Sequence, residues 1–255
     1  MPQHDAAVSG PLVSIVVPVL DDTAQLAGLL GSLARPASVE LVVALGAPPD
    51  RAMRELQART AKVTWVESAA GRGAQMNAGA RRATGRWLLF LHADARLDPG
   101  WLDVLRRVDA EGRAVGGCYR LVLDSTAWAA RVIEWGVAWR VRLLNLPYGD
   151  QAIFVRRAIF EEVGGYREIP LMEDIDLVRR LRRVGRLWHA ELGVRVSARR
   201  WESDGWWRRS TENVILAALY VAGVDPASLA RIYDRQGAAR ARRPSLSRDA
   251  HDPEP

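Results

Sequence analysis

The stretch GRGAQMNAGARRATGRWLLFLHAD, residues 71–94, contains the pattern that decides the fold. Its glycine-punctuated start leads into a helix predicted over about 74–83, with Gly85 as the expected C-cap. The apolar run 87–91 then predicts a strand that is covered on both faces of a parallel sheet. His92-Ala93-Asp94 follows at the carboxyl end of that strand, where open α/β sheets bind their ligands. A carboxylate there can hold a divalent cation against a phosphate, so the stretch indicates chemistry on a phosphorylated small molecule.

The residues before this stretch repeat the same alternation of strand and helix. Strands are predicted over 14–19, 39–45 and 63–66, and helices over 22–33 and 51–59. Repeated βα units of this length imply an α/β fold with a parallel sheet and right-handed crossovers.

The residues after Asp94 follow a less regular pattern. Asp98-Pro99 is expected to open a helix as N-cap and first helical residue. Further strands are predicted at 115–123, 151–155 and 194–198, and further helices at 127–146, 172–184, 206–221 and 226–233. Residues 1–11 and the polar tail 236–255 are expected to be flexible.

The composition excludes several classes of protein. With 255 residues, 49% of them hydrophobic, the chain can bury the core of one large domain. No apolar run reaches the roughly 18–20 residues that cross a bilayer, and the first residues lack the pattern of a secretion signal. The single cysteine, Cys118, excludes an intramolecular disulfide and a cysteine-built zinc site. A cytoplasmic protein is therefore expected.

The charge balance is basic, with a formal net charge of +6 that comes almost entirely from arginine. Such a balance suits nucleic acid, anionic lipid or phosphorylated substrates. No nucleic-acid motif accompanies it, so a nucleic-acid partner is not expected. The arginines between 179 and 186 have helical spacing and are interpreted as a solvated helix face.

Acidic and glycine residues converge on one predicted rim of the sheet. Asp21 and Asp22 also follow a buried strand, so they should emerge at the same edge as Asp94. An isolated aspartate in such a place is usually a turn former, and only the convergence favours a site. The approach to the intervening helix, where backbone N–H groups can face an anion, contains Gly71, Gly73, Asn77 and Gly79.

A second acidic cluster, Glu173-Asp174 with Asp176 beyond, opens the predicted helix 172–184. Acids favour the first turn of a helix through its dipole, and that alone would account for them. The neighbouring Gly164-Gly165-Tyr166 loop and Pro170-Leu171-Met172 suggest instead a shaped entry. A carboxylate between the helix dipole and a nearby phosphate suits a general base that accepts a hydroxyl proton.

Tryptophan and arginine share one face of the helix 127–146. Trp128, Arg131, Trp135, Trp139 and Arg142 are separated by steps of three and four residues. Their mixture suits a membrane interface or a lipid-linked acceptor. It also suits stacking of a sugar, or cation–π packing inside the fold.

Six segments, in one order, resemble glycosyltransferase family 2 and its GT-A fold. They are SIVVPVLDD, GRGAQMNAGARRATG, LLFLHAD, GDQAIFVRR, GGY and MEDIDLVRRLRRVGR. The resemblance is closest to the small soluble "transferase 2-like, rSAM/selenodomain-associated" branch, whose metal motif is commonly HAD. It implies one GT-A domain over 12–235, with a mixed, mostly parallel sheet flanked by helices and with C-terminal helices. It also implies a nucleotide-sugar half at 12–114 and an acceptor half at 115–235.

The resemblance implies a role for several residues of this sequence. A nucleoside diphosphate sugar would lie across the carboxyl edge of the sheet, with Mn²⁺ or Mg²⁺ on Asp94 bridging its phosphates. Asp174, paired with Glu173, would deprotonate the acceptor hydroxyl for in-line attack, which inverts the anomeric carbon. The resemblance does not identify the acceptor. One candidate is a lipid-linked acceptor, for which the protein would contact the inner face of a membrane. The implied donor-binding residues are Pro18, Asp21, Asp22, Arg72, Asn77, Gly79, His92, Ala93 and Asp94.

Two further segments resemble acceptor-side parts of the family. Asp150 and Gln151 look like the acceptor loop, although a turn followed by a strand-edge glutamine is an equal alternative. Arg200-Trp201 resembles an Arg-Trp pair that many members place near the diphosphate, and its alternative is a surface basic pair.

Two departures from the family pattern stand out. Ala44 occupies the position where the family usually has an aspartate that reads the base, so the nucleotide preference is open. His92 replaces the first acid of the DxD motif, and imidazole as a softer ligand mildly favours Mn²⁺.

Two other functions are alternatives to sugar transfer. A nucleotidyltransferase would have a glycine-rich loop directly after the first strand, but no glycine occurs there before Gly28. A catalytically inactive binding module is favoured by Ala44 and His92 and opposed by Asp94 and the Glu173-Asp174 pair.

Overall fold

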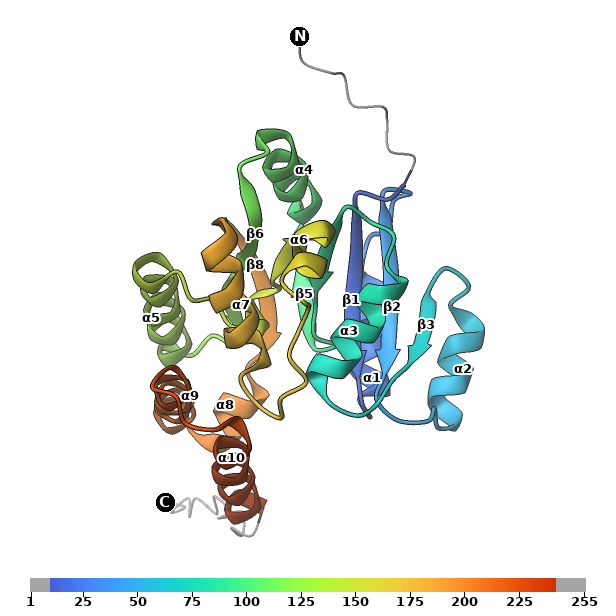
Figure 1. Ribbon diagram of the computed structural model, residues 1–255. Coiled ribbons are helices and arrows are strands. Elements are labelled where there is room, and N and C mark those ends of the chain that lie inside the picture. The colour runs from blue at the N-terminus through green and yellow to red at the C-terminus, as the bar shows by residue number, and fades with distance from the viewer. Residues whose placement is uncertain (1–9, 242–255) are drawn as a thin grey trace, which may run out of the picture.

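The computed structural model describes residues 10–241, which form one eight-stranded sheet with helices on both faces (Figure 1). The strands are β1 (Val13–Val19), β2 (Val39–Leu45), β3 (Thr64–Glu67), β4 (Trp87–Phe90), β5 (Ala95–Leu97), β6 (Ala114–Asp124), β7 (Phe154–Arg156) and β8 (Arg186–Ser197). The helices are α1 (Thr23–Ser32), α2 (Arg51–Arg59), α3 (Arg72–Arg82), α4 (Trp101–Glu111), α5 (Trp128–Leu144), α6 (Arg157–Glu162), α7 (Glu173–Val184), α8 (Arg199–Asp204), α9 (Trp206–Val221) and α10 (Pro226–Ala241), with a 3₁₀ turn, η1, at Gly149–Gln151.

The sheet is mixed and mostly parallel, as predicted. Its order is β3-β2-β1-β4-β7-β6-β8-β5, and the first four strands of that order are parallel. β7 is antiparallel to both β4 and β6, and β8 runs parallel to β6. It follows that β1, β4, β6 and β8 all point the same way, so the residues after them lie at one edge of the sheet.

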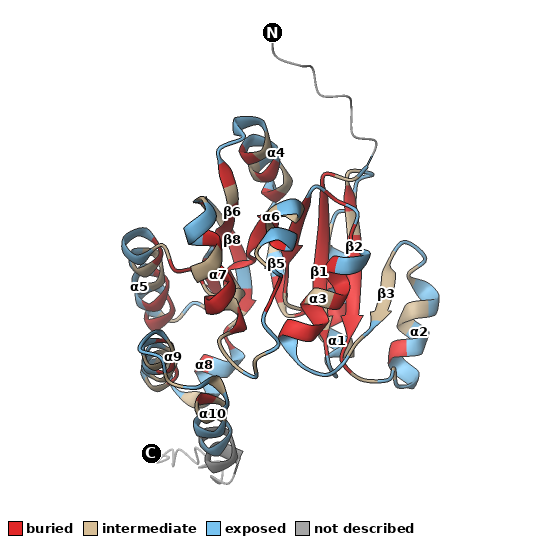
Figure 2. Ribbon diagram, viewed as in Figure 1, coloured by how far each residue is buried: buried red, intermediate tan, exposed pale blue. Residues whose placement is uncertain are grey.

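Two hydrophobic layers hold the helices to the sheet. Because strand side chains alternate, Val13, Ile15 and Val17 face one layer with α1, α4 and α5. Val16 faces the other layer, where α3, α6, α7 and α9 pack. Figure 2 shows that β1, β2 and most of α3 are buried. The sheet edge that carries the site is therefore fixed by a core on both sides.

Several local predictions were wrong. The C-cap of α3 is Ala83, and Gly85 instead approaches β1 so closely that a Cβ would lie 2.6 Å from the backbone nitrogen of Ser14. The N-cap of α4 is Gly100 in the left-handed region, whereas the carboxylate of Asp98 accepts a hydrogen bond from Arg195.

The second half also differs from prediction in the lengths of its elements. The predicted strand 151–155 is divided into η1 and β7, and the predicted short strand 194–198 is the end of the twelve-residue β8. β8 lies between β6 and β5, and this pairing stabilises a sequence with many polar residues as a strand. The short elements β5, α6 and α8 were not predicted.

The predicted flexible tails lie mostly outside the described residues. Residues 236–241 continue α10, so this helix extends past Gln236, where the flexible tail was expected to begin. None of the helices within residues 10–241 is both long and apolar enough to cross a membrane.

Candidate functional site

The sheet edge gathers side chains from both halves of the chain around one cavity. This cavity, the carboxylate cavity, has a volume of about 170 Å³. It is lined by residues that follow β4 and β8, by the segment between β6 and β7, and by the start of α7. Among them are His92, Asp94, Asp150, Glu173, Asp174 and Arg200. The cavity therefore brings Asp94 together with Asp174 of the second acidic cluster, whereas Asp21 and Asp22, which were expected at the same edge as Asp94, do not line it.

Asp174 is held at the N-terminus of α7 by backbone N–H groups. The N–H of Gly149 donates to its Oδ2 at 2.6 Å, and the N–H of Ile175 donates to its Oδ1 at 2.7 Å. Each oxygen keeps a lone pair, because a carboxylate offers about four acceptor positions. The carboxylate is thus oriented towards the cavity and can still accept a proton from a hydroxyl.

Gly149 brings Asp174 and His92 close to each other. A Cβ at Gly149 would lie 3.1 Å from Asp174 Oδ2 and 3.5 Å from His92 Nε2. Burial, with the charges of Arg72 and Arg200, lowers the pKa of His92 to about 3. The imidazole is therefore neutral at physiological pH and has a nitrogen lone pair available for a metal or a proton donor.

Glu173 is buried beside Asp174 and joins α7 to α3. Its Oε1 lies 3.3 Å from Nη1 of Arg72, and Glu173 is only 3% exposed. Burial and the neighbouring Asp174 raise the pKa of Glu173 to about 7, although Arg72 opposes them. Glu173 thus positions the Arg72 guanidinium at the cavity.

This raised pKa predicts that Glu173→Gln gains stability relative to wild type as the pH rises from about 4 to 8. Below the pKa of a glutamate in the unfolded chain, both states hold the proton and Glu173 makes no difference. Above it, the unfolded chain releases the proton first, so the wild type loses stability until the pH passes the folded pKa of about 7. By about pH 8 the gap should be on the order of a few kcal/mol.

Thermal unfolding followed by circular dichroism at several pH values measures this gap. Glu161→Gln is the matched control, because Glu161 lies on the surface of α6 with its side chain 63% exposed. A gap for Glu173→Gln that stays constant with pH would contradict the assignment.

One buried carboxylate oxygen in the cavity, Oδ1 of Asp150, has no hydrogen-bond donor among residues 10–241. Burial raises the pKa of Asp150 to about 6, with Asp174 adding to the rise and Arg140 opposing it. Buried acceptors are nearly always satisfied, so this oxygen marks a position where a ligand hydroxyl group can donate.

Asp94 lies between two cavities, whereas Asp21 and Asp22 lie on the surface. Asp94 lines the cavity of Asp174 and also a neighbouring cavity of about 440 Å³, which is lined by the start of α1. Asp22 is the exposed N-cap of α1 and makes no side-chain cap. Pro18 is half-buried and pairs with Ala44 across β1 and β2. Pro18, Asp21 and Asp22 thus line neither of the two cavities.

Three predicted site residues are occupied by hydrogen bonds or close packing within the protein, so they have little surface or hydrogen-bonding capacity left for a ligand. The side-chain amide of Asn77 donates to Tyr166 O at 2.8 Å and accepts from Tyr166 N–H at 2.9 Å. Gly79 allows α3 to approach β1, since a Cβ would lie 2.4 Å from Val16 Cγ1. Gln151 is 2% exposed and bonds to Arg140 and to the backbone of Tyr119.

The Arg200-Trp201 pair reaches the site from α8. Arg200 is exposed at the mouth of the cavity, and Trp201 forms part of its wall. Trp201 Nε1 donates to Ser210 Oγ at 3.2 Å, and the guanidinium of Arg209 lies 5.4 Å from its ring. The arginine is thus free to meet an anion, while the tryptophan is fixed by α9.

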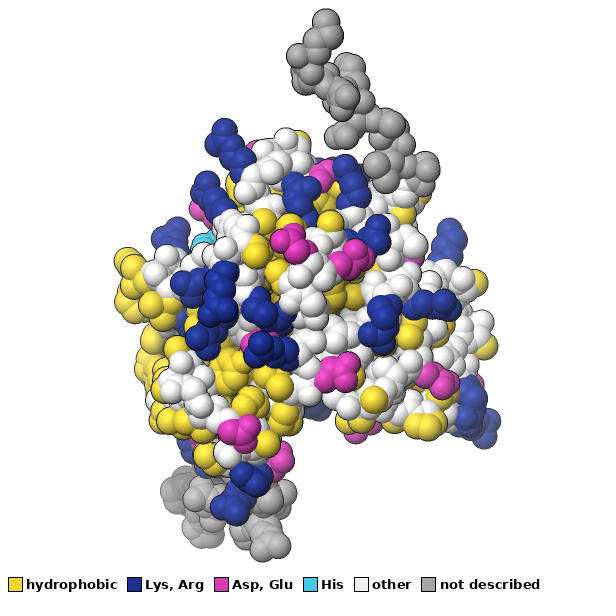
Figure 3. Space-filling model, in the orientation of Figure 1, with side chains coloured by type: hydrophobic (Ala, Val, Ile, Leu, Met, Phe, Trp, Pro, Cys, Tyr) yellow, Lys and Arg dark blue, Asp and Glu magenta, His cyan; other side chains and the backbone are white. Residues whose placement is uncertain are grey.

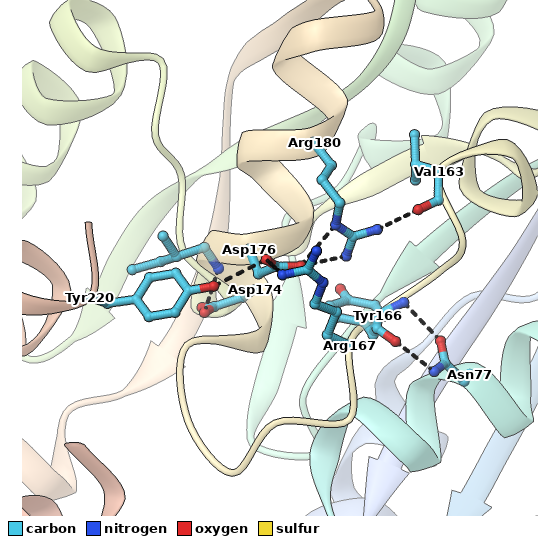
Figure 4. A network of polar contacts seen from close by, with 9 residues as sticks. Asn77, Val163, Tyr166, Arg167, Asp174, Asp176, Arg180 and Tyr220 are labelled. Atoms are coloured by element: carbon cyan, nitrogen blue, oxygen red, sulfur yellow. Dashed lines mark hydrogen bonds and ion pairs between the residues drawn. The ribbon is translucent and has the colours of Figure 1, made fainter. Parts of the chain in front are cut away.

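A polar network centred on Asp176 holds the loop before α7 (Figure 4). Asp176 accepts hydrogen bonds from Arg180 Nε at 2.8 Å and from the hydroxyl of Tyr220 at 3.0 Å, and Arg167 lies 3.3 Å away. Arg180 also donates to the carbonyl of Val163. Asp176 thereby ties α7 to α9 and to the loop that Asn77 holds at its other end.

Sequence reasoning missed Tyr148, Arg140 and Gln75. Arg140 stacks on the ring of Tyr148 at 3.4 Å, and Tyr148 lines the cavity. Gln75 donates to the carbonyls of Val19 and Ala44, so its amide joins the ends of β1 and β2. A Cβ at Gly46 would lie 2.8 Å from that amide, and this glycine, two residues after Ala44, was the signal available in the sequence.

Residues 10–241 contain no group of three His, Cys, Asp or Glu side chains that forms a ready metal site. Asp94 and the neutral His92 nevertheless line one cavity and offer an oxygen and a nitrogen ligand. A cation that binds together with a diphosphate takes several of its ligands from the phosphates. The residues present therefore fit a metal that arrives with its substrate.

The comparison with protein families agrees with this arrangement. The sequence model described as "Glycosyl transferase family 2" matches residues 14–167. The chain belongs to that family. The match runs from β1 to the loop before α7, so it includes Asp94 and ends before Asp174.

Curated relatives and solved structures are also similar to the chain. A "PGL/p-HBAD biosynthesis glycosyltransferase" from Mycobacterium bovis is 33% identical over 174 residues, which are 62% of this chain and 64% of the relative. The mannosyltransferase PcManGT from Pyrobaculum calidifontis, solved with GDP-Man and Mn²⁺, has a TM-score of 0.61 at 18% identity and covers 91% of this chain and 70% of its own. TarS residues 1–349 from S. aureus, solved with UDP-GlcNAc, has a TM-score of 0.58 at 14% identity and covers 89% of this chain and 72% of its own. These likenesses show that the fold is GT-A.

Proposed function

We propose that this family 2 protein is an inverting, metal-dependent glycosyltransferase. Its donor would be a nucleoside diphosphate sugar, and its acceptor would carry a hydroxyl group. The observation that carries the proposal is that Asp94 and Asp174, eighty residues apart, line one cavity together with His92 and Arg200. That set combines a metal ligand, a base and a cation for phosphate.

The donor half of the proposal is supported by the charges around Asp94. Arg72 and Arg200 border the cavity and can compensate the negative charge of a diphosphate. Mn²⁺ or Mg²⁺ on Asp94 would neutralise the charge that develops on the leaving nucleoside diphosphate. Solved structures of the same fold bind UDP-GlcNAc or GDP-Man, so both uridine and guanosine donors belong in a first test.

The acceptor half is supported by the orientation of Asp174. Two backbone N–H groups fix its carboxylate, so a hydroxyl that binds in the cavity meets an oriented base. Asp174 would take the hydroxyl proton while the oxygen attacks the anomeric carbon from the side opposite the leaving diphosphate, which inverts that carbon. Asp150, whose buried Oδ1 has no hydrogen-bond donor among residues 10–241, would receive a hydrogen bond from a sugar hydroxyl.

Incubation with a panel of UDP- and GDP-sugars, with and without Mn²⁺, tests the proposed function. We expect slow release of nucleoside diphosphate from one donor, dependent on Mn²⁺ and measured by chromatography. Release of pyrophosphate from a nucleoside triphosphate and a sugar 1-phosphate, supplied in a parallel incubation, would indicate a nucleotidyltransferase instead. Binding without any turnover, even when acceptors are supplied, would indicate an inactive module.

A further inference from the structure

A large groove lies between α5 and α9. Its volume is about 900 Å³, within the range of pockets that bind organic ligands. One face of α5 provides Ile133, Gly136 and Val137, and the facing side of α9 provides Val214 and Ala218. A groove with walls of this kind suits a hydrocarbon chain.

The groove adjoins the carboxylate cavity. Tyr148, Asp150, Trp201 and Asn213 line both hollows. A ligand that lies along the groove can therefore place one end beside Asp174. A surface for docking another protein would not need to lie beside the carboxylate cavity.

The outer surfaces of the two helices carry tryptophans that the core does not use. The exposed fractions of Trp128 and Trp135 are 69% and 66%, and that of Trp207 is 50%. Trp128 and Trp207 lie ring to ring at 5.6 Å, which joins α5 to α9 on the outside. The predicted Trp and Arg stripe of α5 is thus a surface and not a core stripe.

Arginine side chains of α7 lie next to this apolar surface. Arg179 and Arg182 of α7 line the groove. Figure 3 shows hydrophobic side chains over α5 and α9 beside a group of basic side chains over α7. Apolar walls with basic neighbours match an amphiphile that has a polar or anionic head.

The remainder of the chain does not suit the groove. Residues 1–9 and 242–255 read MPQHDAAVS and RRPSLSRDAHDPEP, and neither contains a run of large apolar residues. A long hydrocarbon chain is therefore a better occupant than either end of the polypeptide.

We propose that the α5–α9 groove binds the hydrocarbon chain of the acceptor, so that the acceptor is a long-chain amphiphile whose hydroxyl reaches Asp174. That the bound amphiphile is the acceptor rests on the proposed function. That the groove binds a hydrocarbon chain does not.

Gly136→Leu is expected to narrow the groove without disturbing the fold. A Cβ at Gly136 meets nothing within 4 Å, and leucine has a higher helix propensity than glycine. Gly31→Leu is the matched control, because Gly31 lies on the exposed side of α1 and a Cβ there also meets nothing within 4 Å.

Binding is measured with ω-bromoundecanol, whose bromine quenches tryptophan fluorescence on contact. Trp201 and Trp207 line the groove, so we expect saturable quenching in wild type and in Gly31→Leu. Across a series of ω-bromoalcohols of increasing length, the affinity for the protein should rise about three- to fourfold with each added methylene group. Gly136→Leu should weaken binding of ω-bromoundecanol at least about tenfold. Equal quenching of the two variants would overturn the proposal.

Transfer assays separate this inference from the proposed function. With the active donor, long-chain alcohols should be glycosylated more efficiently than butanol, and Gly136→Leu should remove that preference while butanol is used as before. Transfer that is indifferent to chain length would overturn the inference and leave sugar transfer intact. Saturable binding of ω-bromoundecanol without turnover of any donor would contradict the proposed function and leave the groove as a binding site for hydrocarbon chains.

Light scattering tests a second copy of the chain as the occupant. We expect the same monomeric mass for wild type and Gly136→Leu. A wild-type dimer that dissociates in Gly136→Leu would make the groove a subunit interface and overturn the proposal.

Discussion

Asp174→Asn is expected to lower kcat about a thousand-fold while the Kd of the donor stays within about twofold of wild type. Asparagine keeps the size of the side chain and can still accept the N–H of Gly149, which donates to Oδ2 at 2.6 Å in the wild type. It cannot take a proton from the acceptor hydroxyl. Single-turnover transfer and calorimetric titration with the donor separate the two effects.

The control for this variant is Asp103→Asn. Asp103 lies on α4 with a side chain that is 70% exposed, away from the residues that line the cavity. We expect it to leave kcat unchanged. Near-normal transfer by Asp174→Asn would remove Asp174 as the base. A thousand-fold loss in Glu173→Gln, with Asp174→Asn active, would move that role to the neighbouring carboxylate.

Asp94→Asn is expected to raise the Kd of the nucleoside diphosphate in the presence of Mn²⁺ at least about a hundredfold. A neutral amide is a weak ligand for a hard cation, and His92 alone would then have to hold the metal for the protein. Without Mn²⁺, the variant and the wild type should bind the nucleotide equally weakly. Calorimetry with the preferred nucleotide, with and without Mn²⁺, measures both values.

Two comparisons sharpen the result for Asp94. Asp103→Asn should retain the full effect of Mn²⁺, because its carboxylate lies outside the cavity. Restoration of nucleotide affinity in Asp94→Asn by a higher Mn²⁺ concentration would agree with a weakened metal site. An unchanged response to Mn²⁺ in Asp94→Asn would show that the metal, if used, is bound elsewhere.

The first half of the fold was predictable because its signals are local. The runs 14–19, 39–45 and 87–91 are apolar enough to be strands buried on both faces, and the observed β1, β2 and β4 agree with them to within a residue. The observed α2 has the predicted bounds. Asp94 could be placed at the carboxyl edge because parallel strands end at the same edge.

The second half was less predictable because its elements depend on partners distant in sequence. β8 extends over a polar segment because β6 and β5 pair with it on its two sides. Gln151, which resembles an acceptor residue, is buried by Arg140 and Tyr119. Whether the tryptophans of α5 face the core or the outside could not be read from their spacing, since a helical stripe has the same period in both cases.

The sequence by itself determined the α/β alternation, the parallel half of the sheet and the carboxylates at its edge, because hydrophobic periodicity and strand ends are local properties of the chain. Only the tertiary structure decided that Gly149 lies against Asp174, that Arg72 pairs with Glu173 and that the α5–α9 groove opens beside Asp150. These contacts join segments from about 25 to 100 residues apart, or from different helices, and their geometry follows from how the layers pack.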